Sequence, residues 1–205
     1  MEVTGLVRPA LLVVDVQNDF CPGGSLAVAN GDKVVPPLNR VSAAFAGAKM
    51  PVFFSRDWHP SDHCSFKDQG GIWPTHCVAG TPGAAFHHDL KIPRGSKVIN
   101  KATESKQEAY SAFQGTDLAA KLHRNRVDTL YVGGLATDYC VKQSVLDALA
   151  EGLAVRIMQD CVRGVNLRRS DSASALRAMK AEGAGITTSA GAIRSIKRAA
   201  MKSSS

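Results

Sequence analysis

Short apolar runs that alternate with helical patterns constrain the fold of this chain more than any other feature. Residues 10–14 form an unbroken apolar run that ends at Asp15. A strand covered by helices on both faces has such a run, because neither of its faces meets water. Comparable runs predict five further strands, at residues 52–55, 97–100, 130–132, 155–158 and 186–188.

Helical patterns lie between these runs. They predict helices over residues 34–49, with prolines near the start, over 116–124, over about 138–150, and from Ser170 or Asp171 to Gly183. Strand–helix alternation predicts right-handed crossovers and a parallel sheet with helices on both faces. We therefore expect an α/β fold, with one three-layer α/β/α domain around a six-stranded parallel sheet. The 205 residues suit one domain, with a core over about residues 9–190 and a basic tail over 191–205.

Charge and cysteine usage limit the possible partners and compartments. The net charge is +7, and much of the excess lies in the tail, at Arg194, Lys197, Arg198 and Lys202. The tail lacks interleaved aromatics, so we interpret it as a solvated helix face and expect no nucleic-acid or membrane partner. Five cysteines without a CxxC pair, and a start at Glu2 rather than at a basic leader, predict free thiols in the cytoplasm.

Reactive side chains follow four of the predicted strands. Asp15 ends the first strand, Asp57 follows the second, Lys101 ends the third, and Cys140 follows the fourth at the start of a helix. Ligands of parallel α/β sheets bind outside the carboxyl ends of the strands. The sequence therefore predicts that these four side chains meet at one edge of the sheet.

Cys140 is the predicted nucleophile. The first turn of a helix and a nearby Lys101 favour a thiolate. Asp15 is interpreted as a general base that Lys101 holds in place, because a bare carboxylate after an apolar strand is costly unless it is paired. The remaining cysteines are expected to be buried and inert.

A metal site is predicted beside this group. Asp57 and His59 lie one residue apart, and in an extended segment their side chains point to the same side. His76 is the natural third ligand and His63 is another candidate. Three protein ligands leave open positions for water or substrate.

These residues resemble those of the nicotinamidases, within the isochorismatase-like cysteine hydrolases. The resemblance extends from Leu11 to about Thr188. It rests on residues 14–20 (VDVQNDF), 57–60 (DWHP), 73–77 (WPTHC), Lys101 and residues 136–141 (ATDYCV).

The resemblance implies the site residues and the chemistry. It implies a catalytic triad of Asp15, Lys101 and Cys140, an oxyanion hole from the N–H groups of Ala136 and Cys140, and one divalent ion, zinc, iron or manganese, on Asp57, His59 and His76. It also implies a substrate pocket with Phe20, Trp73 and Tyr139, and with Tyr110 as a weaker candidate. The implied reaction is hydrolysis of the small molecule nicotinamide to nicotinate and ammonia through a thioester, in NAD salvage.

The resemblance further implies a strand order of 3-2-1-4-5-6 and a cis peptide between Leu135 and Ala136. His63 is left outside the implied metal shell. Oligomeric state stays open, and a homo-oligomer is compatible with this fold.

Other functions compete with this interpretation. An amidohydrolase of the same fold acting on a carbamoyl or ureido substrate would keep the triad without needing the three metal residues together. An isochorismatase-type enzyme would not need Cys140. A non-catalytic zinc protein would use Cys64, His76 and Cys77, although their spacing fits no common structural zinc motif.

Overall fold

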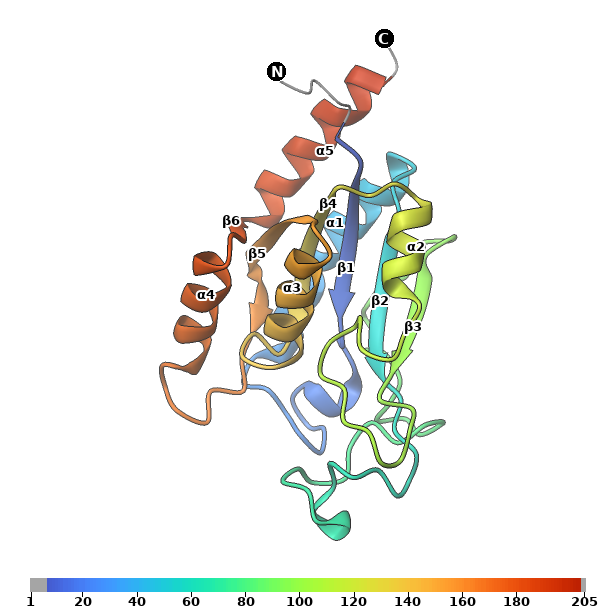
Figure 1. The fold of residues 1–205 in the computed structure, drawn as a ribbon, viewed down its shortest axis with the longest axis vertical. Coiled ribbons are helices and arrows are strands. Elements are labelled where there is room, and N and C mark those ends of the chain that lie inside the picture. The colour runs from blue at the N-terminus through green and yellow to red at the C-terminus, as the bar shows by residue number, and fades with distance from the viewer. Residues whose placement is uncertain (1–6, 204–205) are drawn as a thin grey trace.

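A six-stranded parallel sheet forms the centre of the molecule in the computed structural model, which describes residues 7–203 (Figure 1). Its strands are β1 (Pro9–Val14), β2 (Val52–Asp57), β3 (Lys97–Lys101), β4 (Thr129–Leu135), β5 (Ala154–Arg163) and β6 (Gly185–Thr187). Their order is β3-β2-β1-β4-β5-β6, which confirms the order implied by the resemblance. Residues 1–6, including Glu2, and residues 204–205 lie outside the described part.

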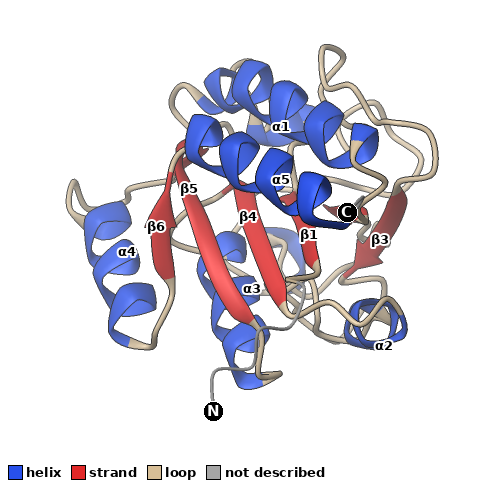
Figure 2. Cartoon of the chain, turned by 90° about the horizontal axis from the view of Figure 1, so that it is seen from above, coloured by secondary structure: helices blue, strands red, loops and turns tan. Residues whose placement is uncertain are grey.

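Helices cover both faces of the sheet, as predicted (Figure 2). One face carries α1 (Val35–Gly47) and α5 (Ser189–Ser203). The other carries α2 (Leu118–Arg124), α3 (Cys140–Ala150) and α4 (Asp171–Ala181). The three-layer α/β/α architecture is confirmed.

β1 shows why the apolar runs predicted this arrangement. Its side chains alternate between two cores: Leu11 and Val13 pack in the core under α1 and α5, while Leu12 and Val14 pack in the core under α2, α3 and α4. All four are fully buried. Helices shield both faces of the strand from water, so each position is apolar.

Several elements differ in length from the predictions. β4 and β5 extend to Leu135 and Arg163, well beyond the short apolar runs. β5 pairs with β6 only from Arg156 to Met158, so its last residues keep an open edge that tolerates polar side chains. α3 begins at Cys140, two residues later than predicted, and α2 begins at Leu118 after Asp117.

The basic tail is a helix that packs on the sheet. Ala192 and Ile196 of α5 are buried in the core beside α1, so the core continues past residue 190. Arg194, Lys197 and Arg198 are exposed, which agrees with a solvated face. Among residues 7–203, no helix combines the length and apolar character that crossing a bilayer requires.

Candidate active site

Four elements bring the predicted reactive side chains to the carboxyl edge of the sheet. Asp15 follows β1, Asp57 ends β2, Lys101 ends β3, and Cys140 begins α3, the element after β4. All four are buried, with exposed fractions of 0%, 5%, 1% and 6%. The predicted convergence is therefore found.

Lys101 is the centre of this group. Its Nζ lies 3.0 Å from Asp15 Oδ2 and 3.5 Å from Cys140 Sγ, and it donates to the carbonyl of Ala109 at 3.1 Å. It also forms an ion pair with Asp57. One buried ammonium thus pairs with two buried carboxylates and contacts the thiol.

Asp15 is held by its backbone and its neighbours. Its φ of 49° lies in the left-handed region, so the chain turns sharply after β1. Its Oδ1 accepts a hydrogen bond from Ser55 Oγ at 2.6 Å. Carboxylate oxygens of Asp15 and Asp57 and the sulfur of Cys140 lie within 4.8 Å of one another, so Asp15 is in range of the thiol proton.

Burial and charge set the protonation states. Burial raises the pKa of Asp15, and Lys101 only partly offsets it. Burial also opposes charge on Asp57, but Lys101 and His59 hold the pKa of Asp57 below its usual range. The pKa of Lys101 is held well above its usual value, because the charges of Asp15 and Asp57 outweigh burial. Lys101 is an ammonium and Asp57 a carboxylate.

The prediction that Cys140 favours the thiolate is wrong for the resting protein. Burial raises the pKa of the Cys140 thiol well above its usual value, and Asp15 and Asp57 raise it further while Lys101 lowers it. The sequence placed the helix start, the lysine and both aspartates near the sulfur, but it did not give the depth of burial that outweighs the effect of Lys101. The thiol therefore needs a base before it can attack.

Asp57, His59 and His76 form a compact set of potential metal ligands. Ligand atoms of all three lie within 4.8 Å of one another, and the residues are buried. His59 Nδ1 faces the carbonyl of Ala102 at 3.2 Å, and His76 Nδ1 faces the carbonyl of Pro74 at 2.8 Å. A carbonyl only accepts, so each Nδ1 carries the proton, and each Nε2 is the ring nitrogen left to bind a metal.

This set fits a divalent metal ion. His59 Nε2 is buried without a hydrogen-bond partner and lies 3.6 Å from Asp57 Oδ2. Two imidazoles and one carboxylate form a donor set typical of functional zinc sites, and iron or manganese accept it as well.

His63, which the sequence left open, lies beside the cluster with both ring nitrogens occupied. Its Nδ1 is 2.7 Å from Ser65 Oγ and its Nε2 is 3.1 Å from the carbonyl of Gln107. Within residues 7–203, Cys64 and Cys77 join no group of three potential metal ligands. The alternative of a structural zinc site on Cys64, His76 and Cys77 is therefore not supported by the geometry.

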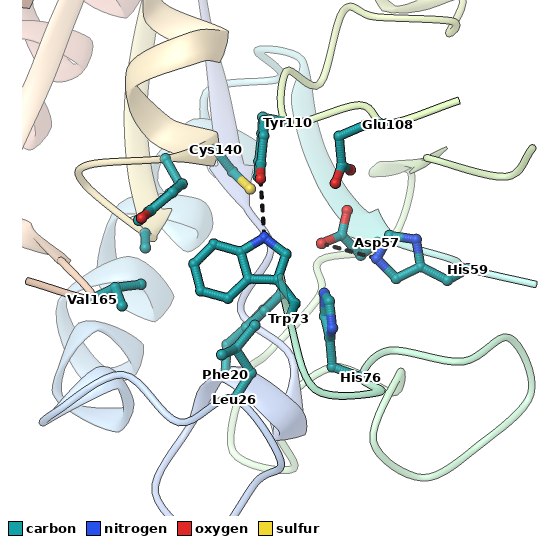
Figure 3. A pocket seen from close by; sticks show the side chains of 12 residues that line it. Phe20, Leu26, Asp57, His59, Trp73, His76, Glu108, Tyr110, Cys140 and Val165 are labelled. Atoms are coloured by element: carbon teal, nitrogen blue, oxygen red, sulfur yellow. Dashed lines mark hydrogen bonds and ion pairs between the residues drawn. The ribbon is translucent and has the colours of Figure 1, made fainter. Parts of the chain in front are cut away.

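One cavity connects the thiol to the metal-ligand set (Figure 3). Trp73 stands in it, donating from Nε1 to the hydroxyl of Tyr110 at 3.0 Å and meeting the ring of Tyr139 edge-on at 5.1 Å. Phe20 lies against His76, with ring centroids 5.6 Å apart. The cavity is lined by these aromatics together with Leu26, Asp57, His59, His76, Glu108, Ala136, Cys140 and Val165.

The sequence missed three of these lining residues. Leu26 and Val165 come from loops, and Glu108 lies in an irregular segment after β3. No motif or periodicity marks them. Asp15 and Lys101 do not line the cavity, and their exposed fractions are 0% and 1%.

The backbone between β4 and α3 brings Cys140 to the cavity. The Leu135–Ala136 peptide is cis, which confirms the implication of the resemblance. Gly134 has a φ of 127°, and a Cβ there would lie 2.0 Å from the carbonyl oxygen of Val14. Only glycine allows β4 to pass this close to β1. Cys140 is the first residue of α3, so its N–H has no acceptor within the helix.

Comparisons with known proteins identify the family of this chain. Residues 9–191 match the isochorismatase domain family. The nicotinamidase of Escherichia coli is 42% identical over an alignment that covers 87% of this chain and 94% of that protein. The crystal structure of the pyrazinamidase of Pyrococcus horikoshii in complex with zinc is 45% identical, with a TM-score of 0.85, over 88% of this chain and 99% of that one. The structure of PnC1 from L. infantum in complex with nicotinate has a TM-score of 0.84 and 32% identity, over 91% of this chain and 96% of that one.

Proposed function

Because this chain belongs to the isochorismatase domain family, we propose that it is a nicotinamidase, a hydrolase that converts nicotinamide to nicotinate and ammonia. One observation carries the proposal: the Cys140 sulfur and the ligand set of Asp57, His59 and His76 face the same cavity. Nicotinamide has an amide that the thiol can attack and a ring nitrogen that a metal can bind.

Asp15 is the proposed base. The Cys140 thiol is protonated at rest, and Asp15 lies within reach of its proton while Lys101 contacts both groups. Transfer of the proton to Asp15 produces the thiolate, which adds to the amide carbon and drives its oxygen to an oxyanion. The ammonium of Lys101 stabilises the thiolate and keeps the Asp15 carboxylate in place.

The N–H groups of Ala136 and Cys140 are the proposed oxyanion donors. Such donors typically contribute about 3–4 kcal/mol each to stabilising the transition state. When the intermediate collapses, the proton held by Asp15 passes to the leaving nitrogen, ammonia departs and a thioester to Cys140 remains. Asp15 then accepts a proton from water, and the hydroxide attacks the thioester. The C–S bond breaks, the proton on Asp15 passes to the Cys140 sulfur, and the acid product releases its own proton to solvent as nicotinate.

Asp57, His59 and His76 are the proposed ligands of a divalent metal. Their buried donors fit such an ion, with the Nδ1 protons fixed by the carbonyls of Ala102 and Pro74. When bound, the metal would supply a Lewis-acid contact for the pyridine nitrogen. Phe20, Trp73 and Tyr139 would enclose the ring, so that its carboxamide lies at Cys140.

The product suggests the metabolic role. Nicotinate is a precursor for pyridine nucleotides, so we place the activity in NAD salvage. A nucleophilic thiol and five free cysteines suit the reducing cytoplasm.

Ammonia release from nicotinamide by purified, reduced protein tests the proposal. We expect activity that is lost on chelation and restored by zinc, iron or manganese, and that is absent from Cys140→Ala under every metal condition. Inactive metal-loaded protein would refute the proposed substrate. Hydrolysis of carbamoyl or ureido amides by that same protein would instead identify it as a related amidohydrolase.

A further inference from the structure

We propose that Gln17 is a positioning residue that fixes Asp57 for metal binding, by pairing its side-chain amide with both backbone groups of Asp57. Gln17 Nε2 donates to the carbonyl of Asp57 at 2.8 Å, and Gln17 Oε1 accepts from the N–H of Asp57 at 2.8 Å. The same Nε2 donates to the carbonyl of Ala84 at 3.0 Å. Gln17 is fully buried. The inference rests on the proposed function insofar as Asp57 is a metal ligand.

The need for Gln17 arises where β1 stops pairing with β2. The ladder runs as far as Val14 opposite Ser55, and the N–H of Asp15 still donates to the carbonyl of Ser55 at 3.1 Å. A continued strand would next pair with Asp57. Instead the chain turns at Asp15, and the carbonyl of Asp15 accepts the N–H of Gln17 at 2.9 Å.

This turn has two consequences for the site. It leaves the Asp15 carboxylate beside Lys101, and it leaves the backbone N–H and carbonyl of Asp57 without the main-chain partners that β1 would have provided. Buried backbone groups require partners. The amide of Gln17 supplies one donor and one acceptor in the place of the missing strand.

Few side chains can do this. The partner must offer a donor and an acceptor in one plane, without charge, at the reach of a glutamine. Asparagine has the same amide on a shorter stem, and methionine has a comparable length with no strong hydrogen-bonding group. These two residues are therefore informative substitutions.

Asp57 gains orientation from this clamp. Its backbone is fixed on one side by Gln17, while its carboxylate faces Lys101 and His59. A second contact, to Ala84, ties the clamp to the loop that follows His76. Partners that orient metal ligands typically contribute about 10–100-fold to metal affinity.

Zinc affinity of the full-length protein, measured by competition with a chromophoric chelator, tests this role. The matched control is Asn18→Ala, which removes a bond of 2.8 Å to the carbonyl of Pro82 in the same neighbouring loop but does not touch Asp57. His59→Ala lacks one proposed ligand, so any zinc that it still binds lies at other sites. One such site is His87, His88 and Asp89, whose ligand atoms also lie within 4.8 Å of one another.

For Gln17→Met we expect a zinc Kd raised about 10–100-fold, a smaller zinc-induced rise in Tm, and a kcat that recovers at saturating zinc. Asn18→Ala should keep the Kd of the unsubstituted protein. Gln17→Asn, which retains the amide, should show a smaller loss of zinc affinity. It replaces Gln17→Met in the test if Gln17→Met does not fold.

An unchanged zinc Kd in a folded Gln17 variant would overturn the proposal, and so would an equal loss in Asn18→Ala. A kcat that stays low at saturating zinc with unchanged Kd would also overturn it. Zinc affinity is measured without substrate, so failure of the unsubstituted protein to hydrolyse nicotinamide would refute the proposed function and leave the Gln17 result standing.

Discussion

Replacing Lys101 by methionine should be among the most damaging single changes to this protein. The ammonium is fully buried and is paired with Asp15 at 3.0 Å and with Asp57, while its remaining contacts are to Ala109 and Cys140. Removing one partner of a buried ion pair costs about 3–5 kcal/mol, because an uncompensated charge is left behind. Here two carboxylates lose their cation, so we expect the free energy of unfolding at neutral pH to fall by at least about 3 kcal/mol.

The loss should depend on pH with a defined sign. Without Lys101, burial and mutual repulsion raise the folded-state pKa of the two carboxyl groups above the ordinary value of 3.8. The folded variant then binds more protons than its unfolded chain between pH 3.8 and the raised pKa. Its stability falls as pH rises through that window, by about 1.4 kcal/mol per pH unit for one proton.

The unsubstituted protein behaves differently at Asp57. In that protein the pKa of Asp57 is lowered. The contribution of the Asp57 carboxylate to the free energy of unfolding is therefore present above pH 3.8 and is lost only as pH falls through the lowered pKa. The stability difference between the two proteins should therefore be largest at neutral pH and should narrow toward pH 4.

Urea unfolding of both proteins across this pH range, without added metal, measures the difference. Lys121→Met is the matched control, because Lys121 forms a solvent-exposed ion pair with Asp117 one helical turn away. Lys121→Met should lower the free energy of unfolding by no more than about 0.5 kcal/mol. A loss for Lys101→Met below about 1 kcal/mol, or a loss that does not change with pH, would refute this account of the buried charges.

Three further changes should separate the roles of individual residues. Cys140→Ala should bind zinc like the unsubstituted protein yet release no ammonia from nicotinamide, and measurable turnover would contradict its role as nucleophile. His63→Ala should leave the zinc Kd unchanged, since both ring nitrogens already have protein partners, so weaker zinc binding would place it in the metal shell. Gly134→Ala should prevent normal folding, because its Cβ would lie 2.0 Å from the carbonyl oxygen of Val14. The control Gly152→Ala, whose Cβ would meet no atom within 4 Å, should lower the free energy of unfolding by only about 1 kcal/mol, as measured by thermal unfolding.

The strand pattern made most of the fold predictable. Apolar runs locate buried strands directly, and parallel strands end at one edge, so the positions of Asp15, Asp57, Lys101 and Cys140 followed from their places after the runs. The ends of β4 and β5 were less predictable, because ladder length depends on which neighbouring strand is present rather than on local hydrophobicity.

Features set by distant contacts could not be predicted from the residues. The carbonyl that occupies His63 belongs to Gln107, which lies 44 positions away in the chain. The protonation of Cys140 depends on the summed effect of burial, one cation and two carboxylates, and the sequence alone does not give their distances. Glu108 reaches the cavity from an irregular segment whose path no local pattern specifies.

The left-handed turn at Asp15 restricts the variation that this position can accept. Backbone geometry at a φ of 49° admits glycine readily and, among residues with side chains, favours asparagine and aspartate. The proposed proton transfer from Cys140 requires a carboxylate at this position. The two requirements overlap in a single amino acid, because most other side chains would add backbone strain of about 1–2 kcal/mol at this φ. Asparagine is the informative exception, because Asp15→Asn should keep the left-handed turn while it removes the proposed base.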